Sequence, residues 1–74
     1  MQQVYVKFDN VDQVRAFVNI LDRFEGDFDM GVGRRVVDAK SILGIAALDL
    51  TQPQRLCFPM ENRELLEKLR PFLW

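Results

Sequence analysis

Residues 11–24 carry apolar side chains at intervals of three and four, and this spacing constrains the fold more than any other feature. It places the apolar side chains along one side of an α-helix and leaves polar residues on the other side. The apolar positions are Val11, Val14, Phe17, Val18, Leu21 and Phe24. Asp9 or Asn10 can cap the start of this helix, and Gly26 is expected to end it. A helix of this kind needs an apolar surface to pack against.

Four other segments alternate apolar and polar side chains, which is typical of half-buried β-strands. They cover residues 4–8, 28–32, 35–39 and 55–60. Gly33 and Arg34 separate the second segment from the third and favour a tight turn, so we predict a β-hairpin there. Pro59 cannot donate a ladder hydrogen bond, which favours a sheet edge or a strand end at that position.

Two shorter helices complete the pattern. Ser41 is a candidate N-cap for a helix over residues 42–48, and Asn62 is one for a last helix that Pro71 bends near its end. The apolar stripe of that last helix consists of Leu65, Leu66, Leu69, Phe72 and Leu73. The order is therefore β-α-β-β-α-β-α. We predict an α+β fold in which three helices cover one face of a four-stranded, mostly antiparallel sheet.

The composition narrows the classes of function. The chain has 74 residues, of which 49% are hydrophobic, so we expect one small folded domain over residues 1–74 rather than disorder. A net charge of −1 argues against a general nucleic-acid or membrane-surface partner. No apolar run approaches the roughly 20 residues that span a bilayer. No signal-peptide pattern is visible either, so a cytoplasmic location is expected.

The chain contains no histidine and one cysteine, Cys57. Histidine is the commonest general base and a frequent metal ligand. Because the chain has none, we expect neither a histidine general base nor a zinc site. Cys57 has no second cysteine with which to form an internal disulfide, and a nucleophilic thiol normally needs a partner base. We therefore expect no enzyme activity, no metal and no cofactor.

The segment Lys40-Ser41-Ile42-Leu43-Gly44, at the end of a short predicted strand and the start of an apolar helix, resembles the regulatory segment of the HPr family. HPr proteins are the phosphocarriers of the bacterial sugar phosphotransferase system. The resemblance covers almost the whole chain in element order and implies an HPr-like open-faced β-sandwich. It also implies that Ser41 is the phosphoacceptor for a serine kinase. Ile42, Leu43, Ile45 and Ala46 would then form an apolar surface that docks protein partners, a transcriptional regulator among them.

The predicted carrier site departs from the family. HPr proteins place the motif Gly-Ile-His-Ala-Arg-Pro-Ala between the first strand and the first helix. Here Asn10 stands at the position of the active histidine and Asp12 at that of the arginine, and the preceding loop is shorter. Phosphohistidine chemistry is excluded, because an amide cannot carry the phosphoryl group and an aspartate repels it. The chain is thus similar to histidine-less regulatory members of the family, such as the catabolite-repression HPr homologue.

A second interpretation of Ser41 and its helix remains open. Ser41 can be a helix cap and nothing more, and the apolar side chains of its helix can all belong to the core. In that case the chain would be a constitutive structural or interaction module. It would then form a homodimer through its apolar C-terminal end, residues 71–74, or through a strand edge.

Overall fold

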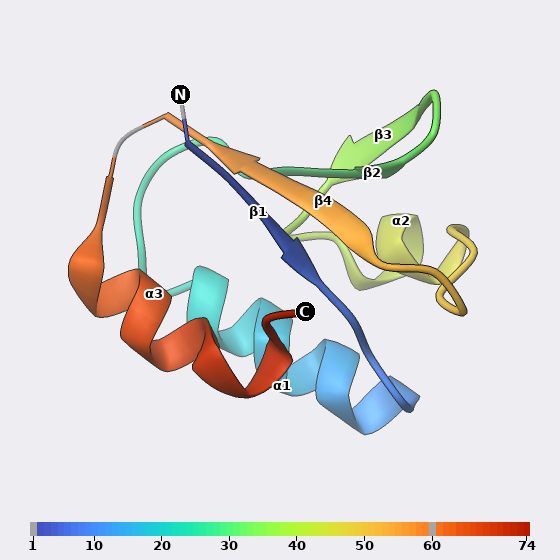
Figure 1. Cartoon of the computed structure of the whole chain (residues 1–74), viewed down its shortest axis with the longest axis horizontal. Helices are drawn as coiled ribbons and strands as arrows, with labels where there is room; N and C mark the ends of the chain where they lie inside the picture. The colour runs from blue at the N-terminus through green and yellow to red at the C-terminus, as the bar shows by residue number, and fades with distance from the viewer. Residues whose placement is uncertain (1, 60) are drawn as a thin grey trace.

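The computed structural model describes residues 2–59 and 61–74. Four strands and three helices follow one another along the chain in the predicted order (Figure 1). They are β1 (Gln2–Val6), α1 (Val11–Leu21), β2 (Asp29–Val32), β3 (Arg35–Asp38), α2 (Ile42–Ala46), β4 (Gln54–Phe58) and α3 (Arg63–Leu69), and a 3₁₀ turn, η1 (Arg70–Phe72), follows α3. The predicted α+β class with an open four-stranded sheet is confirmed.

The strands form one antiparallel sheet in the order β1-β4-β2-β3. β4 therefore lies in the middle of the sheet, between β1 and β2. Pro59 comes directly after the last residue of β4, so it marks a strand end and not an edge. Met60, predicted as the last residue of this strand, lies outside the described residues.

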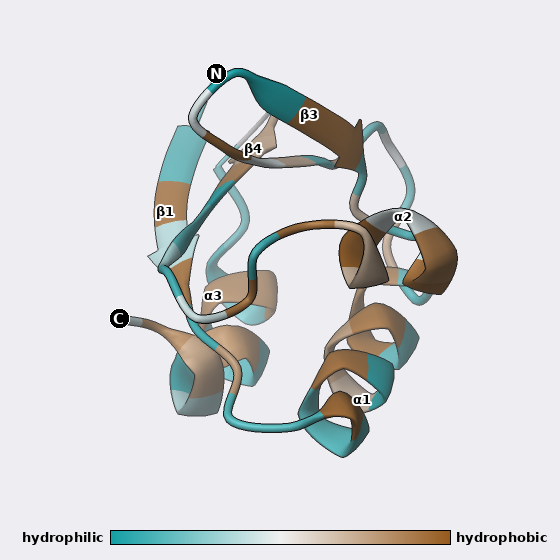
Figure 2. Ribbon diagram, turned by 90° about the vertical axis from the view of Figure 1, so that its right-hand side faces the viewer, coloured by the Kyte–Doolittle hydropathy of each residue, from teal (hydrophilic) through white to brown (hydrophobic). Residues whose placement is uncertain are grey.

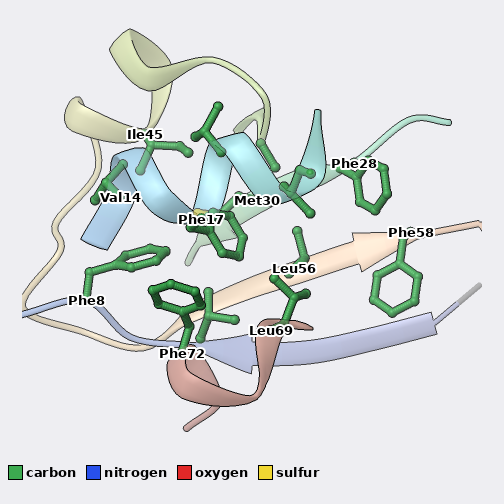
Figure 3. Close-up of a cluster of buried hydrophobic side chains, with 14 of the residues drawn as sticks. Phe8, Val14, Phe17, Phe28, Met30, Ile45, Leu56, Phe58, Leu69 and Phe72 are labelled. Carbon is green, nitrogen blue, oxygen red and sulfur yellow. The ribbon is translucent and has the colours of Figure 1, made fainter. Parts of the chain in front are cut away.

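The helices gather on one face of the sheet, where α1 and α3 run side by side (Figure 1). The alternation of each strand sends its apolar side chains toward them, and Val6, Met30 and Leu56 are fully buried there. Phe17 of α1 and Leu69 of α3 close the core from the other side (Figure 3). Leu21 of α1 and Leu65 of α3 are buried as well, as the apolar stripes predict. No helix of residues 2–59 and 61–74 lies on the opposite face of the sheet.

The first strand and the first helix end earlier than predicted. β1 stops at Val6, because its partner β4 begins opposite that residue, and the chain then carries Phe8 out of the sheet and into the core. α1 stops at Leu21, and the chain tightens into turns in which the N–H of Phe24 bonds to the Leu21 carbonyl at 3.0 Å. Gly26 has a φ of 114° and lies in the connection to β2, and it does not cap the helix directly.

The β2–β3 hairpin forms at the predicted turn. Gly33 has a φ of 58° while Arg34 has no positive φ, the combination found in a type II′ turn. The third strand ends at Asp38, one residue before the predicted end. Ala39 is fully buried and its N–H bonds to the Phe28 carbonyl at 2.8 Å, which closes the hairpin.

None of the helices within residues 2–59 and 61–74 has the length and apolar character that crossing a bilayer requires.

Candidate docking and modification site

Ser41 caps α2 as the sequence predicts. Its backbone is extended, with φ −101° and ψ 109°, and its Oγ accepts the N–H of Gly44 at 3.0 Å. The N–H of Ser41 donates to the Asp38 carbonyl at 3.0 Å, so the capping residue is also hydrogen-bonded to the end of β3. The side chain is half-buried, and its oxygen stands where the free N–H groups of the first helical turn converge.

Three of the four predicted docking residues lie on the exposed side of α2. Leu43 is 86% exposed, Ile42 is 39% exposed and Ala46 is also exposed. Figure 2 shows this short helix as a largely hydrophobic ribbon next to α1. These three residues give α2 an exposed apolar side, while Ile45 is the buried residue of the helix.

The prediction that Ile45 belongs to the docking surface is wrong. Its side chain is 0% exposed and points into the core, in which Val14 of α1 also lies (Figure 3). A helix of five residues has little more than one turn, so only one side of it faces the sheet. Ile45 lies on that side. Ile45 therefore anchors the helix, and the candidate docking surface consists of Ile42, Leu43 and Ala46.

Gly44 lets α2 approach the sheet closely. A Cβ atom at this position would lie 3.2 Å from the Cβ of Val37 and 3.3 Å from the Oγ of Ser41. Both contacts are tighter than ordinary van der Waals packing, so the lack of a side chain brings the helix axis nearer to β3. The same closeness keeps the Gly44 N–H within reach of Ser41.

Lys40 is directed away from its neighbour Ser41. Its Nζ donates to the Phe24 carbonyl at 2.7 Å and lies 5.2 Å from the centre of the Phe28 ring. The ammonium therefore ties β3 to the turns after α1 and gains a cation–π contact. In this chain the lysine of the Lys-Ser-Ile-x-Gly segment has a structural contact of its own.

The residues predicted to occupy a degenerate carrier position form a helix cap. The Oδ1 of Asn10 accepts the N–H of Gln13 at 2.9 Å, and the Oε1 of Gln13 accepts the N–H of Asp9 at 2.7 Å. This reciprocal pair resembles a capping box and stabilises the start of α1. Asp12 lies in the first helical turn, where the helix dipole favours its negative charge. Asn10 thus has a structural role as the N-cap of α1.

A hollow of about 420 Å³ lies next to this cap and is lined by Lys7, Phe8, Asp9, Asn10, Val11, Leu50 and Thr51. Its far wall belongs to the turn before β4, which Asp49 organises. Hydrogen bonds from the Thr51 hydroxyl, the Thr51 N–H and the Gln52 side chain hold the pKa of the Asp49 carboxyl below its ordinary value. These groups bond to one another, so the turn is a preformed wall of the hollow.

Gln54, which the sequence pattern did not single out, fastens the same turn. Its side chain is 0% exposed, and its Nε2 donates to the carbonyls of Asp49 at 2.7 Å and Gln52 at 2.8 Å. Its polar character and its place at the start of β4 suggested no burial. The only signal was its position on the apolar face of the strand alternation, two residues before Leu56.

The remaining polar candidates lie apart from α2. Cys57 is half-buried on the open face of the sheet, where its Sγ lies 3.9 Å from the Gln3 Oε1. Within residues 2–59 and 61–74, no group of three or more cysteine, aspartate or glutamate side chains is arranged to hold a metal ion.

The comparisons with known protein families, with curated proteins and with solved structures each found no match to this chain.

Proposed function

We propose that this protein is an HPr-like regulatory adaptor without phosphohistidine carrier activity, which docks a protein partner in the cytoplasm through Ile42, Leu43 and Ala46. The observation that carries the proposal is the 86% exposure of Leu43, two residues from a serine whose Oγ caps the same helix. An exposed apolar surface beside a modifiable hydroxyl couples partner binding to a change of charge.

Two features support the HPr-like part of the proposal. One is the Lys40–Gly44 segment, which stands between a short strand and an apolar helix as it does in that family. The other is the open antiparallel sheet with its helices on one face. The cap formed by Asn10 supports the loss of carrier activity, since the nitrogen of its amide shares its lone pair with the carbonyl group and is not a nucleophile that could carry a phosphoryl group.

Phosphorylation of Ser41 would change the docking surface without dismantling the fold. A phosphate adds close to two negative charges at the start of α2, where the N–H of Gly44 already donates to the serine oxygen. The phosphate oxygens can accept the same N–H, so the cap is kept. The charge would lie beside Ile42 and Leu43, and it would favour partners with a basic rim over purely apolar ones.

The test is incubation of the purified protein with ATP and an HPr serine kinase, followed by intact-mass spectrometry. We expect one added phosphate on the wild type and none on Ser41→Ala. Leu43→Glu should slow the reaction about tenfold or more, because it places a charge in the docking surface. Tyr5→Glu is the matched control, since Tyr5 is 44% exposed on β1, at the opposite edge of the sheet from β3 and α2. Equal rates for Leu43→Glu and wild type would refute docking through α2.

A constitutive interaction module is the second candidate, and the exposed C-terminal residue favours it. Trp74 is 75% exposed while its N–H donates to the Tyr5 carbonyl at 3.0 Å, so the ring is held at the surface by a fixed backbone. In this case Ser41 is only a cap. Trp74→Ala would then abolish self-association, and the kinase would add no phosphate.

A further inference from the structure

The two edges of the sheet are finished differently. At the β1 edge the chain end runs alongside the strand: Val6 pairs with Leu73, and the N–H of Lys7 donates to the Phe72 carbonyl at 2.9 Å. At the other edge β3 is the last strand in the order β1-β4-β2-β3. Unpaired edge strands present backbone groups that can bond to another strand, and proteins usually cover or block them.

The outward groups of β3 follow from its ladder. The N–H of Ala39 bonds to the Phe28 carbonyl, so the hydrogen-bonded pairs that follow at intervals of two along the ladder are Val37 with Met30 and Arg35 with Val32. Val36 and Asp38 lie between these pairs. Their N–H groups, and the carbonyl of Val36, therefore point away from β2 toward the free edge.

The side chains of Arg34, Val36 and Asp38 are complementary in charge and shape to the same three side chains of a second copy. Val36 is 58% exposed, Asp38 is exposed, and Arg34, the turn residue directly before β3, is exposed as well. When two copies of β3 pair antiparallel about a two-fold axis at Val36, Val36 meets Val36 of the second copy. Arg34 then lies opposite Asp38 of the second copy, and Asp38 lies opposite Arg34. Other registers give fewer pairs or set like charges against each other.

The charges in the isolated chain favour the same partner. Asp38 lies directly opposite Asp29 in the β2–β3 ladder, and like charges in that position repel. Among the described residues, the side chains that form an ion pair are those of Arg70 and Glu67. Neither Asp29 nor Asp38 therefore has a cationic partner there. Arg34 of a second copy would supply one to Asp38 at the free edge.

We propose that two copies of this protein associate through their β3 edges in the register centred on Val36. The pairing joins the two sheets into one, with both open faces on the same side. Backbone hydrogen bonds form at the Val36 pair. The two docking surfaces on α2 then lie on the same side of the joined sheet, because α2 packs beneath β3 in each copy.

The experiment is sedimentation velocity of the full chain from about 10 µM to about 1 mM, because a short strand edge gives a weak dimer with a dissociation constant on the order of 100 µM. Arg34→Glu should weaken the dimer about tenfold, since it sets a carboxylate against Asp38. The double variant Arg34→Glu, Asp38→Lys should return the affinity to within about threefold of the wild type. Such a return requires that the two positions meet across the interface.

Val36→Pro provides an independent variant. It removes an N–H that points out of the sheet, so the β2–β3 ladder is kept while the central pair of the dimer is lost. We expect a monomer with an unchanged circular dichroism spectrum. Trp74→Ala is the control and should dimerise as the wild type does. If Val36→Pro fails to fold, the charge-exchange pair decides the question.

A chain that stays monomeric at all concentrations overturns the proposal. So does a dimer that Arg34→Glu leaves unchanged or that Trp74→Ala abolishes. None of these outcomes bears on docking through α2, which the kinase reaction of Leu43→Glu tests separately.

Discussion

At the scale of single residues, the helix starts are set by three side-chain oxygens. Asn10, Ser41 and Asn62 each accept the N–H of the residue three positions later, at 2.9 Å, 3.0 Å and 3.1 Å. Each bond satisfies one of the N–H groups that a helix leaves free in its first turn. Of these three residues, Ser41 has a hydroxyl group, which can be phosphorylated. Its structural role and its proposed regulatory role therefore depend on the same atom, Oγ.

Ser41→Ala should lower the free energy of unfolding by about 1 kcal/mol, because the Gly44 N–H then loses its acceptor. Ser41→Asp should keep the wild-type stability, since aspartate is as good an N-cap as serine. Urea denaturation followed by circular dichroism measures both. Equal stabilities for alanine and aspartate would show that the bond contributes nothing.

At the scale of the elements, the β2–β3 hairpin depends on a close approach at Gly31. A Cβ atom there would lie 2.5 Å from the Arg35 carbonyl oxygen, and the guanidinium of Arg55 also lies above this position. The obstacle is backbone, so it cannot turn aside as a flexible side chain would. The hairpin that carries the free β3 edge therefore requires glycine at this position.

Gly31→Ala should destabilise the protein by about 1–3 kcal/mol, the range typical of overpacking. Arg34→Ala is the matched control in the same hairpin. Arg34 has no positive φ and is exposed at the turn, so we expect less than about 0.5 kcal/mol of loss. Thermal unfolding of the two variants side by side distinguishes them. A Gly31→Ala melting temperature equal to that of the wild type would contradict the close approach.

At the scale of the whole molecule, a cluster of three aromatic rings joins segments that are far apart along the chain. The centre of the Phe17 ring on α1 lies 5.0 Å from that of Phe8 and 5.8 Å from that of Phe72 (Figure 3). Phe8 and Phe72 are 6.0 Å apart. The chain end thus completes the core and also pairs with β1, so it is part of the folded unit.

Phe72→Ala should cost about 3–5 kcal/mol, which is a large part of the total stability of a domain of this size. Trp74→Ala should change the stability by less than about 1 kcal/mol, because the ring is mostly in water. The measurement is guanidinium denaturation of both variants. A truncation that removes residues 72–74 would unfold the protein, and it therefore cannot serve as a test of self-association. A stable Phe72→Ala variant would show that the aromatic cluster is not required.

The local sequence determined the element order, the three helix caps and the hairpin turn, because each depends on side chains within a few positions of one another. It also predicted the α+β class, since one-sided helices and alternating strands have few ways to bury their apolar faces. The tertiary structure alone decided the rest. Whether Ile45 or Leu43 faces the core depends on the rotation of a five-residue helix on β3, and both residues are equally apolar. The contact of Lys40 with Phe24, the burial of Gln54 and the free edge at β3 likewise arise from segments distant in sequence, whose pairing no local pattern records.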